Sequence, residues 1–414
     1  MTVPRRPDVM TPRHVDVLVV GAGPAGLAAA ARLAAAGAGH VEVLEREARP
    51  GGVPRTCAHG GFGTWTHPLT GPGYARLLTE AAERAGATVR TGVTALDWAP
   101  TGPVLTTVGP GGPETVTARA VVLATGARER PRPARLVPGT RPAGVYTTGE
   151  LQQAVHLFGQ HIGTRAVVVG ATDVSYAAAD TVRAGGAEVV ALVTEHPRAQ
   201  TARARAARLR HGVPLLTDTT VTELLGHGRL SGVRVRHRDG RTAILPCDTV
   251  VFTGDFVPDH ELARRGGLAL DPGTRGPAVA GSLHTSRPGV FAAGNVLHAV
   301  EPAGTAAREG ARAAGAVLDF LAGAPWPAPG VPVTVEPPLR WIAPNRVAPA
   351  APPVPHVLRT GVPLHRPVLY VRQDGRLLHH ERLRTALPDR TLTLTARWHG
   401  RVDPGGGEVR VSTG

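Results

Sequence analysis

A glycine-rich stretch near the start of the chain has the spacing of a phosphate-binding turn. In GAGPAG, the glycines Gly21, Gly23 and Gly26 follow the apolar run VDVLVV and precede an alanine-rich run. At this spacing the first glycine permits a tight turn, the second lets the backbone approach a pyrophosphate, and the third lets the next helix lie close to its strand. The helix N-terminus then faces the anion. We expect the turn to bind a dinucleotide through Gly21, Ala22, Gly23, Pro24, Ala25 and Gly26.

An acidic residue follows at the distance that such a turn requires. Glu45 stands 24 positions after Gly21, at the end of the apolar run VEVLE. A carboxylate at this place accepts hydrogen bonds from the hydroxyl groups of an adenosine ribose. The residue therefore favours an unphosphorylated ribose, as in FAD or NAD, over NADP.

A strand, a helix and a second strand must hold these residues. The sequence predicts strands at 15–20 and 41–45, with a helix from about 24 to 36 between them. Residues 118–127 form a further apolar run that ends in a glycine turn. A βαβ unit of about thirty residues implies an α/β fold with a doubly wound parallel sheet.

The pattern returns in residues 165–195, but with changes at the glycines. Gly170 keeps the first glycine, whereas Thr172 and Ser175 replace the other two, and Glu195 stands 25 positions after Gly170. A side chain at 172 would crowd a pyrophosphate. We expect a second doubly wound domain that fits NAD(P)H poorly. No basic residue is clearly placed for a 2′-phosphate, although His196 and Arg198 are candidates.

Two downstream segments, VVLATGA at 121–127 and TSRPGVFAAGN at 285–295, extend the pattern. With GAGPAG, they resemble the flavoprotein superfamily with two dinucleotide-binding domains, the pyridine nucleotide-disulfide oxidoreductase type, over about residues 14–320. The resemblance implies FAD on the first domain, with the second domain inserted in it. Asn295 replaces the aspartate of the family. The further cofactor contacts that we expect are Glu45, Arg46, Gly52, Val93, Ala124, Thr125, Gly126, Gly294, Asn295 and Gly304.

Four segments resemble one subgroup of that superfamily more closely. They are PGGVPRTCAHGGFG at 50–63, GVYTTGELQQAV at 144–155, VTEHPRAQ at 193–200 and residues 285–301. The subgroup holds the FAD subunits of opine oxidase, proline dehydrogenase and hydrogen cyanide synthase, which act in heteromeric complexes. This resemblance implies oxidation of an amine or amino acid and transfer of electrons to a partner subunit or acceptor protein. Some members carry a cysteine-rich iron–sulfur domain at the C-terminus, which the cysteine-free end of this chain lacks.

The chain has two cysteines, Cys57 and Cys247, far apart in the sequence. A disulfide reductase needs two thiols side by side at the flavin. We therefore expect neither a disulfide reductase nor a metal site, and interpret Cys57 as a small residue packed near the cofactor.

Three residues are candidates for catalysis beside the flavin. Arg55 could bind a carboxylate with two hydrogen bonds. His59 and His298 could each accept a proton near neutral pH. For each, the alternative is a structural residue or a contact to FAD. Glu301, before the predicted helix at 304, is expected to have no role beyond the helix start, and the arginines of 203–210 to lie on a solvated helix face.

Composition narrows the other classes of function. The chain of 414 residues carries a net charge of +14, but its aromatic content is only 4% and its arginines are scattered. Nucleic-acid binding needs a basic patch with stacking aromatics, so we do not expect it. The apolar run at 17–31 is interrupted by Gly21, Gly23, Pro24 and Gly26. We therefore expect neither a membrane span nor a signal peptide, and we expect a cytoplasmic location.

The expected organisation has three parts. After a Pro-rich tail at 1–13, residues 14–140 and 286–322 are expected to form the FAD-binding domain, with the NAD(P)-binding-like domain at 141–285 between them. A Pro-rich linker at 323–366 would join these to a small β-rich module at 367–414.

Together these observations predict an FAD-dependent oxidoreductase that moves a hydride from an amine or amino acid to flavin N5. Two alternatives stay open. One is an NAD(P)H-dependent flavoprotein reductase of a protein or quinone acceptor. The other is a non-catalytic, FAD-holding subunit of a complex.

Overall fold

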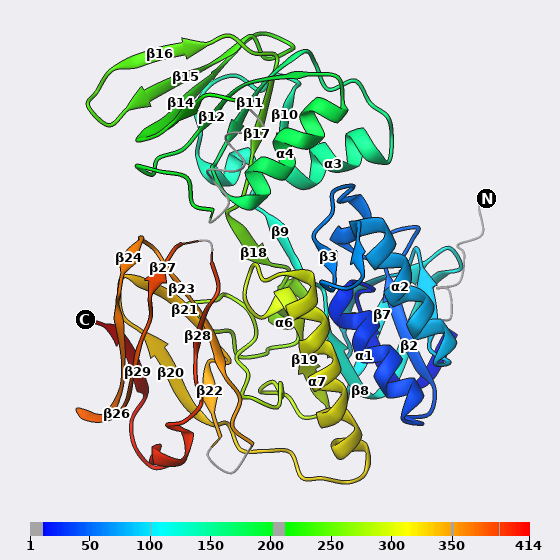
Figure 1. The fold of residues 1–414 in the computed structure, drawn as a ribbon. Coiled ribbons are helices and arrows are strands. Elements are labelled where there is room, and N and C mark those ends of the chain that lie inside the picture. The colour runs from blue at the N-terminus through cyan, green and yellow to red at the C-terminus, as the bar shows by residue number, and fades with distance from the viewer. Residues whose placement is uncertain (1–10, 101, 202–211, 349–351, 389) are drawn as a thin grey trace, which may run out of the picture.

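The computed structural model describes residues 11–100, 102–201, 212–348, 352–388 and 390–414. They form a first α/β part, a second α/β part and a C-terminal β part (Figure 1). The arginine pair at 5–6 and the arginine-rich run at 203–210 lie outside the described residues. No helix in the described ranges is long and apolar enough to span a membrane.

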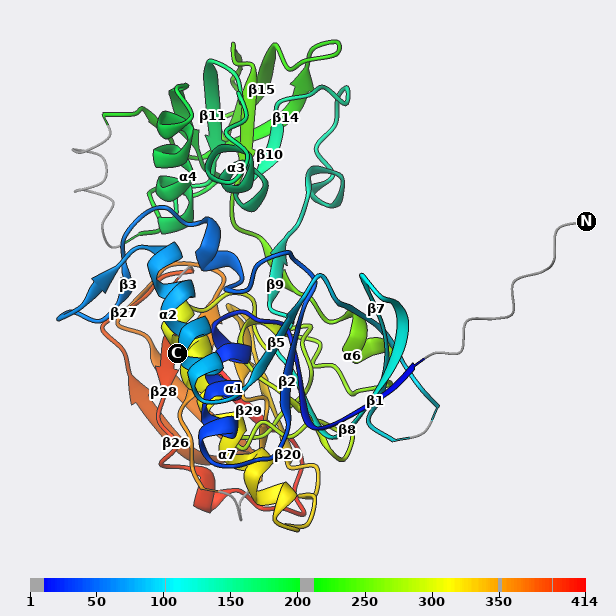
Figure 2. The ribbon, with the colours of Figure 1, turned by 90° about the vertical axis from the view of Figure 1, so that its right-hand side faces the viewer.

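The first α/β part is built on a sheet with the strand order β5-β2-β1-β8-β7-β6, and β19 also pairs with β8. The strands β1, β2, β5, β8 and β19 run parallel, whereas β7 is antiparallel to β8 and β6 is antiparallel to β7. Helix α1 lies between α2 and α7 against this sheet (Figure 2). The elements are β1 (Thr11–Val20), α1 (Pro24–Ala35), β2 (Val41–Glu45), α2 (Gly71–Arg84), β5 (Thr88–Thr91), β6 (Thr94–Trp98), β7 (Val104–Gly109), β8 (Gly112–Leu123), β19 (Val290–Ala292) and α7 (Ala303–Leu321).

The expected boundary of the N-terminal tail is wrong, because β1 begins at Thr11 and not at residue 15. Residues 11–15 pair with 114–118 of β8, whose long strand extends beyond the buried sheet. The side chains of residues 17–19 are fully buried, as expected for the central strand of a doubly wound sheet.

The second α/β part has a parallel sheet with the order β10-β17-β11-β12-β13 and a three-stranded antiparallel sheet, β14-β15-β16. The chain enters it through β9 and leaves through β18, which pair antiparallel with each other. The expected fold class, with the second doubly wound domain inserted in the first, is therefore confirmed. The elements are β9 (Ala127–Glu129), β10 (Val145–Thr147), α3 (Thr148–His156), β11 (Arg165–Val169), α4 (Asp173–Ala184), β12 (Glu188–Val193), β13 (Leu215–Leu216), β14 (Thr219–Leu225), β15 (Gly232–His237), β16 (Thr242–Leu245), β17 (Thr249–Phe252) and β18 (Phe256–Pro258).

The chain returns to the first α/β part earlier than the expected residue 286. Leu262 and Ala263 of α6 (Glu261–Arg265), and Leu268 after it, belong to the same hydrophobic core as β1 and α1. The core of the second part already includes Val137. The crossing points of the chain are therefore β9 and β18.

The expected Pro-rich linker at 323–366 is wrong, because much of this segment forms strands. β20 (Val331–Val335) pairs with β29 (Val409–Thr413) at the other end of the C-terminal β part, and β21 (Leu339–Ala343) pairs with β23 (His356–Thr360). The prolines do not prevent this, because Pro332 faces solvent and most others lie between strands. The remaining elements are β22 (Arg346–Val347), β24 (Leu364–His365), β25 (Val368–Gln373), β26 (Arg376–Arg382), β27 (Thr385–Ala386) and β28 (Leu392–Leu394).

The C-terminal β part has its own core and also contacts the first α/β part. The buried core includes Trp398, Leu369 and Val409. Outside it, Asn345 Oδ1 accepts a hydrogen bond from the backbone N–H of Val279 at 2.8 Å. The β-rich region is thus larger than expected and packs directly on the first α/β part.

Candidate functional site

A cavity of about 2380 Å³ lies where the three parts meet. Its walls include the carboxyl ends of β1, β2 and β8, the N-terminal ends of α1, α4 and α7, and Arg390 of the C-terminal β part. Ligands of doubly wound folds bind at this end of the sheet. The expected site residues that line the cavity are Gly21, Gly23, Pro24, Ala25, Glu45, Arg46, Gly52, Arg55, His59, Val93, Ala124, Thr125, Gly126, Asn295 and Gly304.

The first glycine turn has the shape of a phosphate cradle. Gly21 has φ +107°, and a Cβ atom on it would lie 2.4 Å from the carbonyl oxygen of Ala124. Gly23 is different, since a Cβ there would meet no protein atom closer than the Cα of Gly52 at 4.0 Å. The space beside Gly23 therefore belongs to the cavity and is open to a pyrophosphate.

Glu45 lies at the wall of the cavity, with an exposed fraction of 7%. Its two carboxylate oxygens accept hydrogen bonds from the backbone N–H groups of Ala22 at 3.1 Å and Glu47 at 2.9 Å. Because a carboxylate has about four acceptor positions, it can still accept ribose hydroxyls. The first cradle and its acid therefore fit the adenosine and pyrophosphate of FAD.

Four expected site residues do not line the cavity. Ala22 is fully buried and gives its N–H to Glu45. Gly26 and Gly294 pack against backbone or Cβ atoms, where a Cβ would lie 1.9 Å from Gly21 O and 2.6 Å from Ala25 Cβ respectively. These three residues do not border the cavity, and the close packing at Gly26 and Gly294 brings α1 and α7 near the turn.

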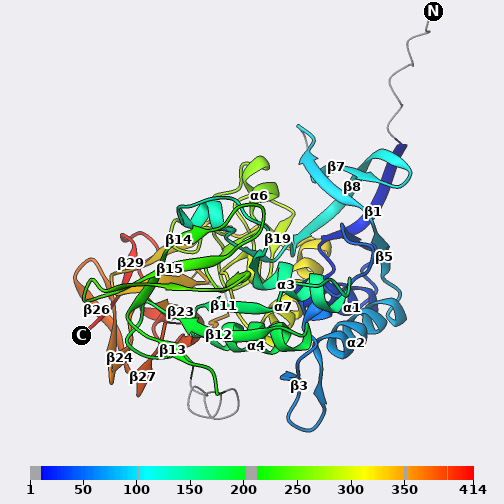
Figure 3. The same cartoon turned by 90° about the horizontal axis from the view of Figure 1, so that it is seen from above.

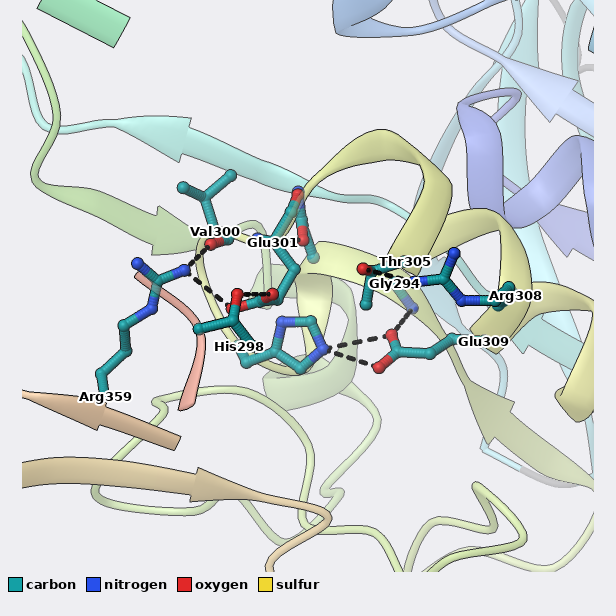
Figure 4. A network of polar contacts seen from close by, with 10 residues as sticks. Gly294, His298, Val300, Glu301, Thr305, Arg308, Glu309 and Arg359 are labelled. Atoms are coloured by element: carbon teal, nitrogen blue, oxygen red, sulfur yellow. Dashed lines mark hydrogen bonds and ion pairs between the residues drawn. The ribbon is translucent and has the colours of Figure 1, made fainter. Parts of the chain in front are cut away.

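His298 is the fourth, and the expectation that it acts on a substrate is wrong. Its side chain is fully buried, and its Nε2 lies 2.9 Å from Glu309 Oε1 (Figure 4). Burial lowers the pKa of His298, but the Glu309 carboxylate raises it further, and the net pKa is above the usual value. The other oxygen of Glu309 accepts the N–H of Gly294 at 3.1 Å. The pair ties α7 to the turn after β19.

Arg55 and His59 do border the cavity, on the segment after Gly52. Arg55 lies 3.8 Å from Glu47, and its buried Nε atom has no hydrogen-bond partner among the described residues. His59 Nδ1 lies 2.7 Å from the carbonyl oxygen of Gly60, so it donates its proton there. That tautomer leaves Nε2 as the proton-accepting nitrogen.

Cys57 also lines the cavity, as a buried free thiol. Burial raises its pKa to about 11, so the thiol stays protonated at neutral pH. The other free cysteine, Cys247, belongs to the core of the second α/β part. The structure thus gives Cys57 no second thiol with which to form a dithiol pair.

The second cradle is closed by its own side chains. At the N-terminus of α4, the Thr172 hydroxyl accepts the N–H of Ser175, and the Ser175 hydroxyl accepts the N–H of Thr172 at 3.1 Å. Ser175 Oγ also lies 2.6 Å from Thr253 Oγ1. Two of the backbone N–H groups at this end of α4 are therefore already paired with side chains.

Asp173, which the sequence analysis did not single out, adds a negative charge at this place. It occupies the first turn of α4, lines the cavity and accepts a hydrogen bond from Thr201. An acid stabilises a helix N-terminus but repels a phosphate. The order Thr-Asp-x-Ser is a capping signal and could have predicted this closure.

A second charged group that the sequence did not reveal lies near Glu45. Asp259, which follows β18, is 3.4 Å from Arg46 and 3.6 Å from Arg128, and all three line the cavity. Burial and the neighbouring Glu261 raise the pKa of Asp259 to about 6. Arg46, expected to contact the cofactor, thus already has a carboxylate partner.

The N-terminal end of α7 borders the cavity through Asn295, Glu301 and Gly304. The Asn295 amide bonds the backbone of Glu301 on both sides, at 2.9 and 3.1 Å. The expectation that Glu301 serves only the helix start is wrong. Its buried carboxylate lies 2.7 Å from Arg359 and accepts the Thr391 hydroxyl, so it joins the C-terminal β part to the cavity wall (Figure 4).

Comparisons with known proteins agree with this architecture. The sequence pattern of the family described as pyridine nucleotide-disulphide oxidoreductase matches residues 15–310. An opine oxidase subunit of Rhizobium meliloti is 29% identical over 316 residues, 68% of this chain and 58% of that protein. Ferredoxin–NADP reductase of Salinispora tropica is 32% identical over 295 residues, 68% of this chain and 86% of that protein.

A solved structure confirms the fold. Thioredoxin reductase of T. acidophilum is 23% identical, with a TM-score of 0.62 over 74% of this chain and 99% of that one. The resemblance to opine oxidase subunits inferred from four segments is also confirmed. Because this chain spans only 58% of the Rhizobium meliloti protein, that match does not carry the activity of the whole relative with it.

Proposed function

The chain belongs to the pyridine nucleotide-disulphide oxidoreductase family, whose cofactors are FAD and NAD(P)H, and we propose that it oxidises a small amine or amino acid with FAD and passes the electrons to a partner protein. When bound, FAD supplies a two-electron acceptor for hydride. The contrast between the two cradles supports an amine or amino acid as the donor over NAD(P)H, because the first cradle is open and the second is closed by side chains.

The first cradle would hold the cofactor. Gly21 and Gly23 shape the turn, and Glu45 borders the cavity where the adenosine ribose would bind. The N-terminal end of α7 at Gly304 lies on the same cavity wall, and a helix N-terminus favours negative charge. The cavity also extends to α3 and α4 of the second α/β part, where a small donor would bind.

The second cradle fits NAD(P)H poorly. Thr172 and Ser175 satisfy each other's N–H groups, and Asp173 places a carboxylate where the pyrophosphate would bind. Like charges at a helix N-terminus oppose anion binding. This supports a donor that reaches the flavin directly and does not need the second dinucleotide site.

The cysteines support the further proposal that this oxidoreductase does not reduce disulfides. Disulfide exchange needs a thiolate with a partner thiol at the flavin. Cys57 is buried with a pKa of about 11 and has no second cysteine beside it, and Cys247 is equally buried in another core.

The side chains at the cavity suggest how the protein would prepare its donor. An amine must lose its proton before it can give up a hydride from the neighbouring carbon. His59 can accept that proton at Nε2, because its Nδ1 is engaged with Gly60. Arg55, held by Glu47, remains the candidate for orienting the donor or the cofactor pyrophosphate.

An anaerobic titration of the FAD-loaded chain tests the proposal. Amino acids, N-alkyl amino acids and simple amines would be added one by one, with NADH and NADPH in parallel, while the visible absorbance of oxidised flavin is followed. We expect one class of amine or amino acid to remove this absorbance and both nucleotides to leave it unchanged.

The other outcomes contradict the proposal in different ways. Rapid loss of the absorbance with NADH or NADPH would favour a nucleotide-dependent reductase, the activity named for the relative that shares 32% identity. If no donor acts, the chain would instead be an FAD-holding subunit that has no donor of its own.

A further inference from the structure

We propose that Arg308 and Arg390 form a carboxylate-binding subsite of the cavity, so that the C-terminal β part belongs to the active site and selects donors that carry a carboxylate. The inference rests on the proposed function for the chemistry of the donor. Its geometry rests on two arginines from distant parts of the chain that line the same cavity.

Most arginines of the cavity wall are already neutralised by acids. Arg46 and Arg128 pair with Asp259, and Arg130 pairs with Asp255 at 3.2 Å. Arg265 pairs with Asp97 at 2.5 Å, and Arg55 lies 3.8 Å from Glu47. The charge of each of these guanidinium groups is thus balanced by a carboxylate within the protein, although Arg55, whose contact is the longest, keeps the role proposed above.

Three cavity arginines have no carboxylate partner within the described residues: Arg49, Arg308 and Arg390. Arg49 follows β2 and the ribose-binding Glu45, at the adenosine end of the cavity. Arg308 lies in the second turn of α7, where its side chain donates a hydrogen bond to Thr305 Oγ1 at 2.9 Å (Figure 4). Arg308 and Arg390 therefore remain as two cations that no described acid neutralises, on the cavity wall near the start of α7.

The C-terminal β part holds Arg390 close to the start of α7. Thr391, the next residue, donates its hydroxyl proton to the carboxylate of Glu301. Arg359 of β23 binds the same carboxylate at 2.7 Å, and the side chain of Glu301 is fully buried. Because Glu301 stands two residues before α7 begins, these contacts fix the backbone beside Arg390 at the end of the helix that carries Arg308.

An aromatic wall completes the subsite. Phe62 lies at the base of the hairpin of β3 (Phe62–Gly63) and β4 (Pro68–Leu69), which projects from the body of the molecule (Figure 3). Its ring lies 5.8 Å from that of Tyr74 and 5.5 Å from that of His59, and all three residues line the cavity. A ligand with one carboxylate and an apolar body matches this combination of charge and ring surface.

Calorimetric titration of the FAD-loaded protein tests the subsite without relying on turnover. The probes are benzoate, which has a carboxylate on an apolar ring, and benzamide, which has the same shape without the charge. We expect benzoate to bind and benzamide to bind much more weakly. Arg390→Gln and Arg308→Gln should each weaken benzoate by about 10- to 100-fold, the usual effect of losing a charge-assisted hydrogen bond.

A matched control is Arg382→Gln, which removes an exposed arginine of the same β part outside the cavity. It should leave benzoate binding unchanged. Benzoate that does not bind the unaltered protein, or that binds Arg390→Gln as tightly as the unaltered protein, would overturn the inference. Because Arg390 is exposed, its variant should fold normally, as a thermal melt would verify.

The two proposals fail in distinguishable ways. If NADH reduces the flavin while benzoate binding still depends on Arg390, the proposed donor is wrong and the anion subsite stands. If an amine reduces the flavin and neither arginine affects benzoate, only the subsite is wrong.

Discussion

Gly23 is the residue at which added side-chain volume should affect the cofactor and spare the fold. A Cβ atom there would meet no protein atom closer than 4.0 Å, yet the residue lines the cavity. We expect Gly23→Val to fold but to bind FAD at least about tenfold more weakly, because its methyl groups occupy the space of the pyrophosphate. Equilibrium dialysis of FAD against the variant measures this.

The control for this substitution is Gly315→Ala on α7. A Cβ at Gly315 meets nothing within 4 Å, and alanine is the better helix former by roughly 0.5–1 kcal/mol. This variant should keep its FAD and melt at a slightly higher temperature. Equal FAD affinity of Gly23→Val and the unaltered chain would rule out the cradle as the binding site.

For single residues, the residue types predicted the chemistry of the glycine turn but not every contact with the cavity. Glycines at 21, 23 and 26 are spaced for a known geometry, so their roles were readable. Ala22, Gly294 and His298 were placed on the cofactor because they stand next to its motifs in sequence. Whether an adjacent residue faces the cavity or the core depends on the local backbone direction. Ala22 and His298 are fully buried, and Gly294 packs on Ala25.

Among the elements, we expect the N-terminus of α4 to determine whether the second domain binds a nucleotide. Thr172→Gly combined with Asp173→Asn removes both the cap and the charge. We expect the double variant to bind NADH about fivefold or more tightly than the unaltered chain, since a like charge leaves the helix N-terminus. Calorimetric titration with NADH measures the difference.

Asp180→Asn serves as its control, because it removes the same charge from the same helix and the same cavity, but two turns away. It should leave NADH binding as it is. NADH binding that is already tight in the unaltered protein would contradict the idea that the cap closes this site.

The strands of the C-terminal β part enclose a histidine pair that should make this part sensitive to acid. His356 Nε2 lies 2.7 Å from His399 Nε2, and burial together with His399 lowers the pKa of His356 to about 3. The unfolded chain binds the proton near pH 6.5. The stability that neutral His356 contributes is therefore present above pH 6.5 and is lost as the pH falls toward 3.

The expected slope is about 1.4 kcal/mol per pH unit below pH 6 for this one group. Scanning calorimetry between pH 7.5 and pH 5 should show a falling melting temperature, and His356→Gln should flatten the fall. A fall of the same steepness in that variant would show that other groups cause it.

The elements also show where sequence patterns mislead. The βαβ units were readable because apolar strands and alanine-rich helices alternate with glycine turns. The segment 323–366 was expected to be a linker because of its prolines, yet β20 pairs with β29, more than seventy residues later. Such a pairing depends on long-range contacts, which no local pattern contains.

For the whole molecule, the buried pair of Glu301 and Arg359 joins the C-terminal β part to the first α/β part. The side chain of Glu301 is fully buried and that of Arg359 is 10% exposed. We expect Arg359→Met to destabilise the protein by about 3–5 kcal/mol, because it leaves a buried carboxylate without its cation. Chemical denaturation measures this change.

The double variant Arg359→Met with Glu301→Gln tests the cause. Since it removes both charges, it should recover much of the lost stability. A double variant no more stable than Arg359→Met would mean that the arginine acts through packing on Trp341, over which it lies at 5.7 Å, and not through charge.

The arrangement of the three parts also explains why some charged residues of the candidate site could not be predicted from the sequence. The glycines and Glu45 indicate a nucleotide site from the sequence alone. Arg308, Arg390 and Asp259 reach the cavity wall only through tertiary packing. Nothing in their sequence neighbourhoods marks them. The proposed role of the two arginines depends on which acids pair with the other arginines of the cavity wall.

The flavin content of the purified chain shows whether the first cradle binds FAD. The chain would be denatured and the released cofactor identified and counted by chromatography, before and after incubation with FAD. We expect about one FAD per chain, because one dinucleotide cradle is open. A protein that carries no flavin and takes up neither FAD nor any other flavin would contradict it.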